Sequence, residues 1–400
     1  MPGGQDVAGS ARATEARRWV EARAGEMADL VEALVAVDTE NPPGRGLAEC
    51  ASVLRAALQR LDMAPEIIEL APSAELEDPR IVRATAGDGA QLVYFHGHFD
   101  VVPAQRRDQF VPQRRDGRIT GRGTADMKGG LVSMIYGAAA ARALGLLADA
   151  RVVLHFVCDE ETGSAAGSGH LRGAGLIDAG AAAMLTPEPT GGVVWHASRG
   201  AITLRVTVSG REAHVGQAHL GVNAFEHMVE IARPLSVLAH DLLEERGSTL
   251  VVGGAAGAGA NFNVVPGAAW FSVDRRFNPE EDLDEEMERL TETIERAASA
   301  RGADVSIEVL QRQPSGHTEA TSPAAATLGE CVAAVQHAEA WFEVCPGSLD
   351  TRWYAQLGIP AFGYGAGRLD VAHGPDEFIE QAAMGRCAAV YALFAGAITQ

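Results

Sequence analysis

The segment YFHGHFDVVP (residues 94–103) ends an apolar run with three polar side chains at alternating positions, His96, His98 and Asp100. Because successive side chains of a strand point to opposite faces, these three side chains share one face. Two interpretations fit this pattern taken alone. The residues form a buried hydrogen-bonded cluster, or they bind a metal ion or a substrate.

The residues around this segment predict a buried parallel sheet. QLVYFHG (91–97) and ARVVLHFV (150–157) are strand-type runs, and MKGGLVSMIYGAAAARALGL (127–146) between them predicts a helix. A strand, a helix and a second strand in this order, with nearly continuous apolar strands, indicate parallel pairing covered on both faces.

The sequence pattern changes near residue 198. GAITLRVTVSG (200–210) and AAWFSVDRRF (268–277) alternate apolar and polar residues, as half-exposed strands do. A helix-like run covers 223–240. The glycine-rich VVGGAAGAGA (251–260) predicts a flexible connection.

A further helix is predicted in the acidic segment 278–300, with Asn278 as its N-cap and an acidic first turn that matches the helix dipole. We therefore predict an α/β fold of two domains. A mostly parallel central sheet flanked by helices would form a discontinuous domain from residues 1–197 and 312–400. A smaller α+β domain would be inserted at residues 198–311.

Composition excludes several classes of partner. The formal net charge of -20 argues against non-specific binding to nucleic acid or anionic membranes, which requires clustered positive charge. Five scattered cysteines without a C-x-x-C pair indicate neither a disulfide framework nor a thiolate zinc site. The first 25 residues lack the apolar core of a signal peptide, and no stretch approaches the ~20 apolar residues of a membrane span. We expect a cytoplasmic protein with no nucleic-acid or membrane partner.

Acidic residues and another histidine gather where other elements end. They are Asp126 in GRGTADMKGG, Glu160 and Glu161 in DEETGS, Glu188 in TPEPT and His373 in AHGPDE. Strand ends and their loops are where α/β sheets bind ligands. Carboxylates and imidazoles that converge without thiolates suit zinc or a similar divalent ion. Acids this close would repel one another, and a pair of cations would remove that penalty.

Five motifs together resemble those of the M20 family of zinc amidohydrolases and peptidases. They are GHFDVVP, GRGTADMKGG, DEETGS, TPEPT and AHGPDE, and they occur in family order over nearly the whole chain. The family includes acetylornithine deacetylase, succinyl-diaminopimelate desuccinylase, aminoacylase-1 and glutamate carboxypeptidase. The resemblance implies a catalytic domain built from 1–197 and 312–400 and a lid and dimerisation domain at 198–311.

The resemblance also implies a set of metal ligands. It assigns His98 and Glu188 to a first metal, Glu161 and His373 to a second, and Asp126 to both, with a cis peptide bond after Asp126. Asp100 would then hold the His98 imidazole, as metal-bound histidines require. His96 has no ligand role in the pattern, and we interpret it as structural. The implied cofactor is two zinc ions per subunit, with cobalt or manganese as alternatives.

Glu160 is the acid that the resemblance leaves without a metal. It would act as the general base toward a metal-bridging water and then return the proton to the leaving amine. In the inserted domain, His214 of GREAHVGQAHLGVNA matches a family histidine that stabilises the oxyanion across a homodimer formed through the lid.

Asn263 and Arg276 match family positions that bind substrate. They lie in NFNVVPGAAWFSVDRR, and an arginine can hold a carboxylate through two parallel hydrogen bonds. A cross-strand ion pair that involves Asp274 and Arg276 is the alternative interpretation.

The resemblance implies a metal-dependent hydrolase of amide C–N bonds, acting on a small N-acyl amino acid in the manner of a deacetylase or desuccinylase. Two alternatives use the same metals: a metallo-carboxypeptidase or dipeptidase of the glutamate carboxypeptidase type, and a hydrolase of N-carbamoyl (ureido) substrates. A single methylene in a pocket changes discrimination by only ~1–3 kcal/mol, so the acyl group is left open.

Overall fold

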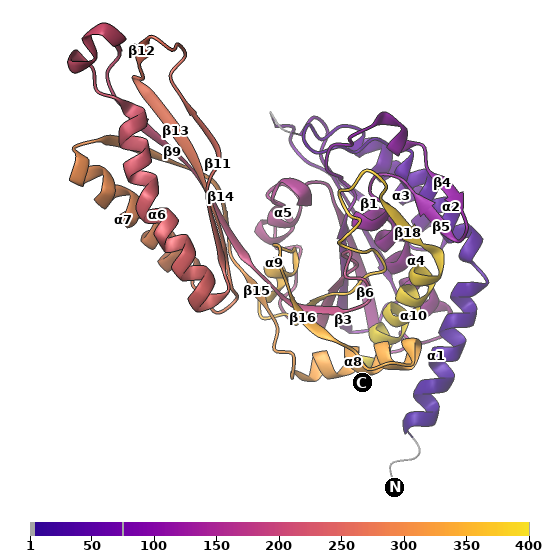
Figure 1. Cartoon of the computed structure of the whole chain (residues 1–400). Coiled ribbons are helices and arrows are strands. Elements are labelled where there is room, and N and C mark those ends of the chain that lie inside the picture. The colour runs from indigo at the N-terminus through magenta and orange to yellow at the C-terminus, as the bar shows by residue number, and fades with distance from the viewer. Residues whose placement is uncertain (1–4, 74–75, 400) are drawn as a thin grey trace. The chain divides into compact units, whose positions relative to one another are not determined.

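The computed structural model describes residues 5–73 and 76–399 (Figure 1). The chain divides into two compact units. Residues 198–316 and 345–348 form the second unit, and the rest of the chain forms the first. Along the described chain, no helix combines the length and apolar character needed to cross a membrane.

The first unit is built on a nine-stranded sheet. In spatial order its strands are β1 (Glu66–Glu69), β2 (Arg80–Ala86), β6 (Ala150–Val157), β3 (Gln91–His98), β7 (Ala183–Thr186), β17 (Ala361–Gly363), β8 (Val194–Ser198) and β15 (Gly316–His317), with β16 (Phe342–Cys345) paired to β8. Pairing is parallel at the centre, from β6 through β3 and β7 to β17, and antiparallel where β1, β2 and β8 join. The predicted α/β fold with a mostly parallel central sheet is confirmed.

Alternating side chains of the central strands pack into two cores, one on each face of the sheet. Val93 and Phe95 of β3 join the larger core, whereas Leu92 and Tyr94 join the smaller one. Helices cover both faces. The larger core holds α1 (Gln5–Glu21), α2 (Ala24–Val35), α3 (Leu47–Arg60), α4 (Gly129–Ala143), α8 (Pro323–Gln336) and α10 (Gln381–Ala397), and the smaller one holds α5 (Ser168–Gly173) and α9 (Thr351–Ala355). Figure 1 shows α4 and α10 on one side of β3 and β6, and α5 and α9 on the other.

A small antiparallel sheet also belongs to the first unit. Its strands are β18 (Phe378–Glu380), β5 (Arg118–Thr120) and β4 (Gln113–Arg115), in this order. The register pairs Glu380 with Arg118, so this sheet ties the C-terminal part of the chain to the segment that precedes Asp126.

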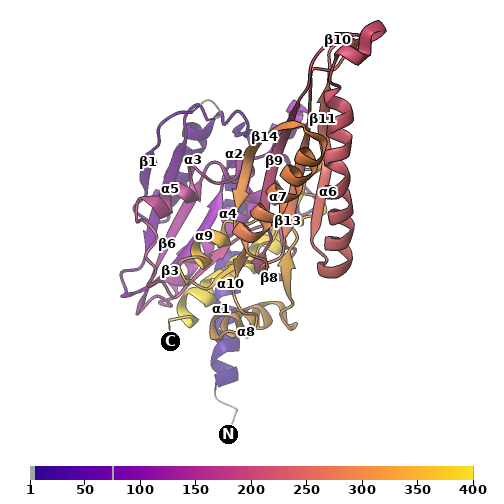
Figure 2. The ribbon, with the colours of Figure 1, turned by 90° about the vertical axis from the view of Figure 1, so that its left-hand side faces the viewer.

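The second unit is an antiparallel sheet covered by two helices. Its strand order is β11 (Thr249–Ala258), β13 (Ala268–Phe277), β9 (Gly200–Ser209) and β14 (Asp304–Gln313). Apolar side chains of these strands pack against α6 (Ala224–Arg246) and α7 (Leu283–Arg301). Both helices run along the same face of the sheet (Figure 2).

Two local predictions in this unit were wrong. The glycine-rich segment 251–260 is mostly the edge strand β11, because pairing with β13 satisfies its backbone groups despite the poor strand propensity of glycine. The N-cap of α7 is Asp282, whose side chain accepts from the backbone N–H groups of Asp284 and Glu285. Asn278 instead donates its amide to the Arg246 carbonyl at 2.7 Å.

A short ribbon extends this unit at one end. β10 (Ala213–His214) pairs with β12 (Val264–Val265), and a helical turn, η4 (Val215–Leu220), follows β10 (Figure 2). The role of this unit as a lid and dimerisation domain stays a prediction.

Candidate metal centre

Parallel pairing brings the ends of three central strands to one edge of the sheet. His98 ends β3, Glu160 and Glu161 lie in the turn η3 (Glu160–Thr162) that follows β6, and Glu188 lies just after β7. Carboxyl ends of parallel strands meet at the same edge, so strand order alone places these groups together. Asp126 lies in an irregular helical turn, η2 (Thr124–Lys128), and His373 lies in the loop before β18.

Asp126 lies between two histidines. Its Oδ1 is 3.2 Å from His98 Nε2, and its Oδ2 is 3.2 Å from His373 Nε2. His373 Nε2 is also 3.2 Å from Glu161 Oε1. The peptide bond between Asp126 and Met127 is cis, as the resemblance implied.

The ligand atoms form two groups that share Asp126. The first set comes from His98, Asp126 and Glu188, and the second comes from Asp126, Glu161 and His373. Within each set all ligand atoms lie within 4.8 Å of one another. The structure therefore brings together all five predicted metal ligands, and the shared carboxylate gives the centre the form of a two-ion site.

The buried carboxylates of the site repel one another, and cations would neutralise them. Burial raises the pKa of Glu188 to about 8, and repulsion from Asp126 adds to it. Burial likewise raises the pKa of Glu160 and of Glu161. Glu188 is 4% exposed, and its Oε1 has no hydrogen-bond partner among the described residues. A buried carboxylate oxygen without a donor is costly unless a cation neutralises it.

The pKa values of His98 and His373 are also raised, but here hydrogen bonds to carboxylates are the cause. Burial alone would lower the pKa of His98, but its hydrogen bonds to Asp100 and Asp126 outweigh burial and raise it. Bonds to Asp126 and Glu161 raise the pKa of His373 to about 10. The carboxylates around each imidazole therefore favour positive charge at both positions.

Asp100 organises the inner end of the site. His98 Nδ1 donates to the Asp100 backbone carbonyl at 3.0 Å, which directs Nε2 toward Asp126. The Asp100 carboxylate accepts from the backbone N–H groups of Glu160 and Glu161, both at 3.2 Å. Asp100 thus orients a candidate ligand and also fixes the turn that carries the two glutamates. Fixing of this kind keeps a ligand set in place.

Glu160 is near the metal ligands without joining either set. Its Oε2 lies 4.0 Å from His98 Nε2, and the side chain is 15% exposed, more than that of Glu161. The Glu160 carboxylate therefore lies beside the centre with its oxygens not assigned to a metal ion. Such a carboxylate suits proton transfer.

His96 is buried in a separate polar chain beneath the site. Arg83 Nε donates to His155 Nε2 at 3.2 Å, and His155 Nδ1 is 2.8 Å from the Tyr354 hydroxyl. That hydroxyl is 3.1 Å from His96 Nδ1, and His96 Nε2 lies 2.9 Å from Asp350 Oδ2. Because Arg83 can only donate, each next group donates onward, and Asp350 accepts at the end. This agrees with a structural role for His96.

The predicted site residues of the second unit lie in two places. His214 and Asn263 are exposed on the end ribbon, where the Val215 N–H donates to the Asn263 carbonyl at 2.9 Å. Arg276 lies far from this ribbon. β13 begins at Ala268, just after the ribbon strand β12, and Arg276 is eight residues farther along β13, about 26 Å at the usual rise of a strand. Its guanidinium pairs with Asp274 at 2.8 Å, so the two residues do form an ion pair, but along β13 and not between two strands.

Sequence reasoning missed several residues that support the centre. Asn41 donates to the Asp100 carboxylate at 3.0 Å and to the Thr162 hydroxyl at 2.9 Å. The buried Glu377 accepts from the backbone N–H of Asp126 at 3.0 Å. A signal existed for Glu377, because it follows His373 by four residues in the same motif. Asn41 carries no comparable signal.

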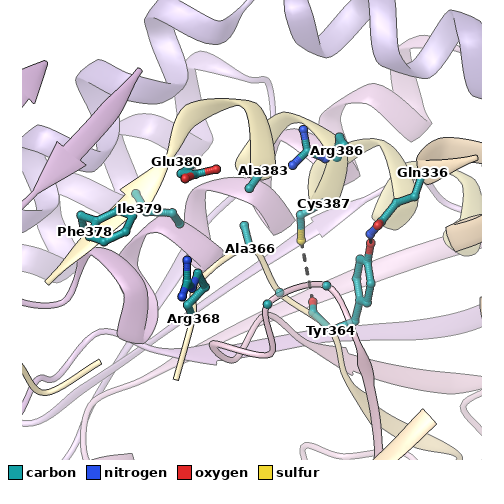
Figure 3. A pocket seen from close by; sticks show the side chains of 13 residues that line it. Gln336, Tyr364, Ala366, Arg368, Phe378, Ile379, Glu380, Ala383, Arg386 and Cys387 are labelled. Atoms are coloured by element: carbon teal, nitrogen blue, oxygen red, sulfur yellow. Dashed lines mark hydrogen bonds between the residues drawn. The ribbon is translucent and has the colours of Figure 1, made fainter. Parts of the chain in front are cut away.

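A separate cavity of about 130 Å³ lies beside the turn at residues 364–367 (Figure 3). Tyr364, Arg368, Glu380, Arg386 and Cys387 help to line it, and none of its lining residues is a candidate ligand. The turn itself packs on the centre: a Cβ at Gly365 would collide with the backbone carbonyl oxygens of Pro187 and Glu188. Glycine is required there for close backbone approach.

Comparison with known proteins adds to this geometry. The sequence model of peptidase family M20/M25/M40 matches residues 94–397. A succinyl-diaminopimelate desuccinylase of Corynebacterium glutamicum is 29% identical over 301 residues, which cover 72% of this chain and 76% of that protein.

Two solved structures share the fold. An M20 family metallo-carboxypeptidase from Sulfolobus solfataricus superposes with a TM-score of 0.77 at 17% identity, covering 92% of this chain and 98% of that one. A dinuclear metal binding peptidase of the M20 family from Bacillus subtilis superposes with a TM-score of 0.69 at 17% identity, covering 94% and 98%.

Proposed function

The chain belongs to peptidase family M20/M25/M40 and is a metal-dependent hydrolase of C–N bonds, and we propose that it removes the acyl group from an N-acyl amino acid. One observation carries the proposal. Asp126 is shared by two sets of ligand atoms, while Glu160, the neighbour of the ligand Glu161, belongs to neither set. A two-ion centre beside an uncommitted carboxylate suits the hydrolysis of an amide.

His98, Asp126 and Glu188 would hold one ion, and Asp126, Glu161 and His373 the other. The donor set of imidazole and carboxylate fits zinc, with cobalt or manganese as alternatives. When bound, the ions supply Lewis-acid chemistry, which activates water and polarises a carbonyl oxygen.

Glu160 moves the proton in this proposal. Its carboxylate takes a proton from the attacking water as the new C–O bond forms. It then gives that proton to the amine nitrogen as the C–N bond breaks. Burial of the side chain favours the neutral carboxyl form, which helps Glu160 to hold the proton between the two steps. Asp100 holds the turn so that Glu160 does not drift toward the ligand positions.

The second unit would supply the remaining contacts. We assign His214 to stabilisation of the oxyanion and Asn263 and Arg276 to substrate binding. His214 and Asn263 are exposed on a ribbon whose apolar side chains Val215 and Phe262 are also exposed, 55% and 110%. Such a surface suits a partner or a substrate that covers it.

A homodimer through this unit is part of the proposal. α6 exposes four large apolar side chains, at Phe225, Val229, Val237 and Leu243. β11 beside it is an edge strand with open backbone groups. An exposed apolar helix face next to an open strand edge is a surface that native proteins cover.

The similarity to a desuccinylase favours N-acyl amino acids as the substrate class. The likeness in fold to a metallo-carboxypeptidase keeps dipeptides as the second candidate, because the same centre would cleave a peptide bond beside a free carboxylate. N-carbamoyl amino acids are the third class, since their C–N bond offers the same carbonyl to attack.

The test is amine release by the zinc-loaded protein from N-acetyl, N-succinyl and N-carbamoyl amino acids and from dipeptides. Glu160→Ala serves as the blank and should keep both ions, because Glu160 belongs to neither ligand set. We expect turnover of the N-acyl class that disappears in the variant. Turnover confined to dipeptides or ureido substrates would replace the acyl assignment, and loss of an ion in Glu160→Ala would refute the assigned base.

A further inference from the structure

A buried ion pair adjoins the second ligand set, and its hydrogen bonds reach the backbones of two ligands. Arg122 Nη1 donates to Glu377 Oε2 at 2.6 Å, and both side chains are 1% exposed. Burying two charges is expensive, and a well-packed apolar pair is often no less stable. The pair therefore needs an explanation beyond stability, and its other hydrogen bonds provide one.

The carboxylate of Glu377 holds the backbone that presents Asp126. Oε1 accepts from the N–H groups of Ala125 at 2.9 Å and Asp126 at 3.0 Å, and Oε2 accepts from Gly123 at 3.0 Å. Three backbone donors of one irregular turn thus converge on one carboxylate. Asp126 and Met127 have non-helical backbone angles within this turn, so the bonds to Glu377 help to define the direction in which the Asp126 side chain leaves the backbone.

The guanidinium of Arg122 holds the backbone that presents His373. Arg122 Nη2 donates to the His373 carbonyl at 3.2 Å and to Gln105 Oε1 at 2.8 Å. Gln105 Nε2 donates to the same carbonyl at 2.9 Å. His373 has a φ of 61°, in the left-handed region that residues other than glycine rarely adopt. Two donors on its carbonyl help to hold this conformation.

We propose that Arg122 and Glu377 are positioning residues that set the separation of Asp126 and His373 for the second metal ion. The inference rests on the proposed two-ion centre. Glu377 fixes the backbone of Asp126, and Arg122 fixes the backbone of His373. The 2.6 Å bond between Arg122 and Glu377 joins the two. The positions of two ligands far apart in the sequence are therefore coupled through a single contact.

The neighbouring ion pair offers a matched control. Arg118 and Glu380 join the same two segments at 3.1 Å, but both are exposed and neither contacts the backbone of a ligand. If connecting the segments were sufficient, removing either pair would have the same effect on metal binding. If the hydrogen bonds to the ligand backbones matter, only the buried pair should affect it.

The experiment is calorimetric titration of metal-free protein with Zn²⁺, with a competing chelator to resolve tight binding. The native protein should bind two ions. Glu377→Gln is nearly isosteric, but its amide NH₂ must face backbone N–H donors. We expect one of the two ions to bind about 10–100-fold more weakly, the usual effect of removing a partner that orients ligands. Glu380→Gln should bind both ions within threefold of the native constants.

Two results would overturn the proposal. In the first, folded Glu377→Gln has native constants for both ions, even if its metal-free form melts at a lower temperature, because that is what a purely structural pair predicts. In the second, Glu380→Gln weakens binding as much as Glu377→Gln does. Failure of the native protein to bind two ions would instead refute the proposed centre itself.

If Glu377→Gln does not fold, Gln105→Ala decides the question. Gln105 is exposed, so its removal should leave folding intact, yet it takes one donor from the His373 carbonyl. We expect one ion to bind about 2–10-fold more weakly, the effect of one hydrogen bond. Unchanged binding of both ions in this variant would count against the proposal.

Discussion

Replacing Glu188 by glutamine should stabilise the metal-free protein at alkaline pH. Burial raises the pKa of Glu188 in the folded state to about 8, from the ordinary 4.5. Between these pH values the unfolded chain has released the proton and the folded chain still holds it. The free energy of unfolding therefore falls as pH rises through this range, and the loss is complete above pH 8.

The magnitude follows from the two values. A difference of 8 − 4.5 = 3.5 in pKa, at 1.36 kcal/mol for each unit, corresponds to about 5 kcal/mol. This is an upper bound, because Asp126 and other nearby acids contribute to the shift and relax when one of them is neutralised. Glutamine cannot ionise, so the variant should regain up to this amount at pH 8 and almost none at pH 4.5.

The assay is urea denaturation of chelator-treated protein at pH 5 and pH 8, following the transition of the unit that contains Glu188. Glu280→Gln, at an exposed position, controls for the change of side chain itself. With Zn²⁺ present the sign should reverse, because the variant lacks a ligand. Equal stability of native and variant metal-free protein at pH 8 would refute the argument that burial destabilises this carboxylate.

Three other experiments probe the support of the site and its completion. Gly365→Ala should lower the free energy of unfolding by about 1–3 kcal/mol in thermal denaturation, because its Cβ would meet two backbone carbonyls. The control is Gly25→Ala at an exposed position of α2, which should be neutral or stabilising by about 0.5–1 kcal/mol. Tyr354→Phe removes the hydroxyl between two buried histidines and should cost about 1–3 kcal/mol in urea denaturation, and a cost near zero would argue that the polar chain is not coupled there. His214→Ala and Glu160→Ala should each be inactive alone and regain activity when mixed, and silence in verified mixed dimers would exclude action across the dimer.

The strands and the five ligands were predictable because their signals are local. A buried strand is a continuous apolar run, and parallel pairing brings His98, Glu161 and Glu188 to one sheet edge whatever the loops do. The resemblance to the M20 motifs then supplied the ligand roles of Asp126 and His373. These side chains do converge in the structure.

The remaining features depend on partners far away in the chain, and no spacing reveals them. The segment 251–260 is a strand only because β13 lies beside it. The cap of α7 moved to Asp282, since Asn278 found a partner in the Arg246 carbonyl. Glu377 is visible as an acid near a motif, but its three backbone donors belong to a turn some 250 residues earlier.

The insertion of one unit within the other has a consequence for biosynthesis. The second unit is complete, apart from residues 345–348, once residue 316 has been made. At that point the first unit still lacks β17, which pairs with β7 at the centre of its sheet, and α10, which packs in its larger core. At about 5–20 residues per second, roughly 4–16 seconds of synthesis separate residue 316 from the end of α10. During that time β7 lacks its partner β17 and α4 lacks α10, which packs against it. We therefore expect chaperone binding to protect the nascent chain most in this period.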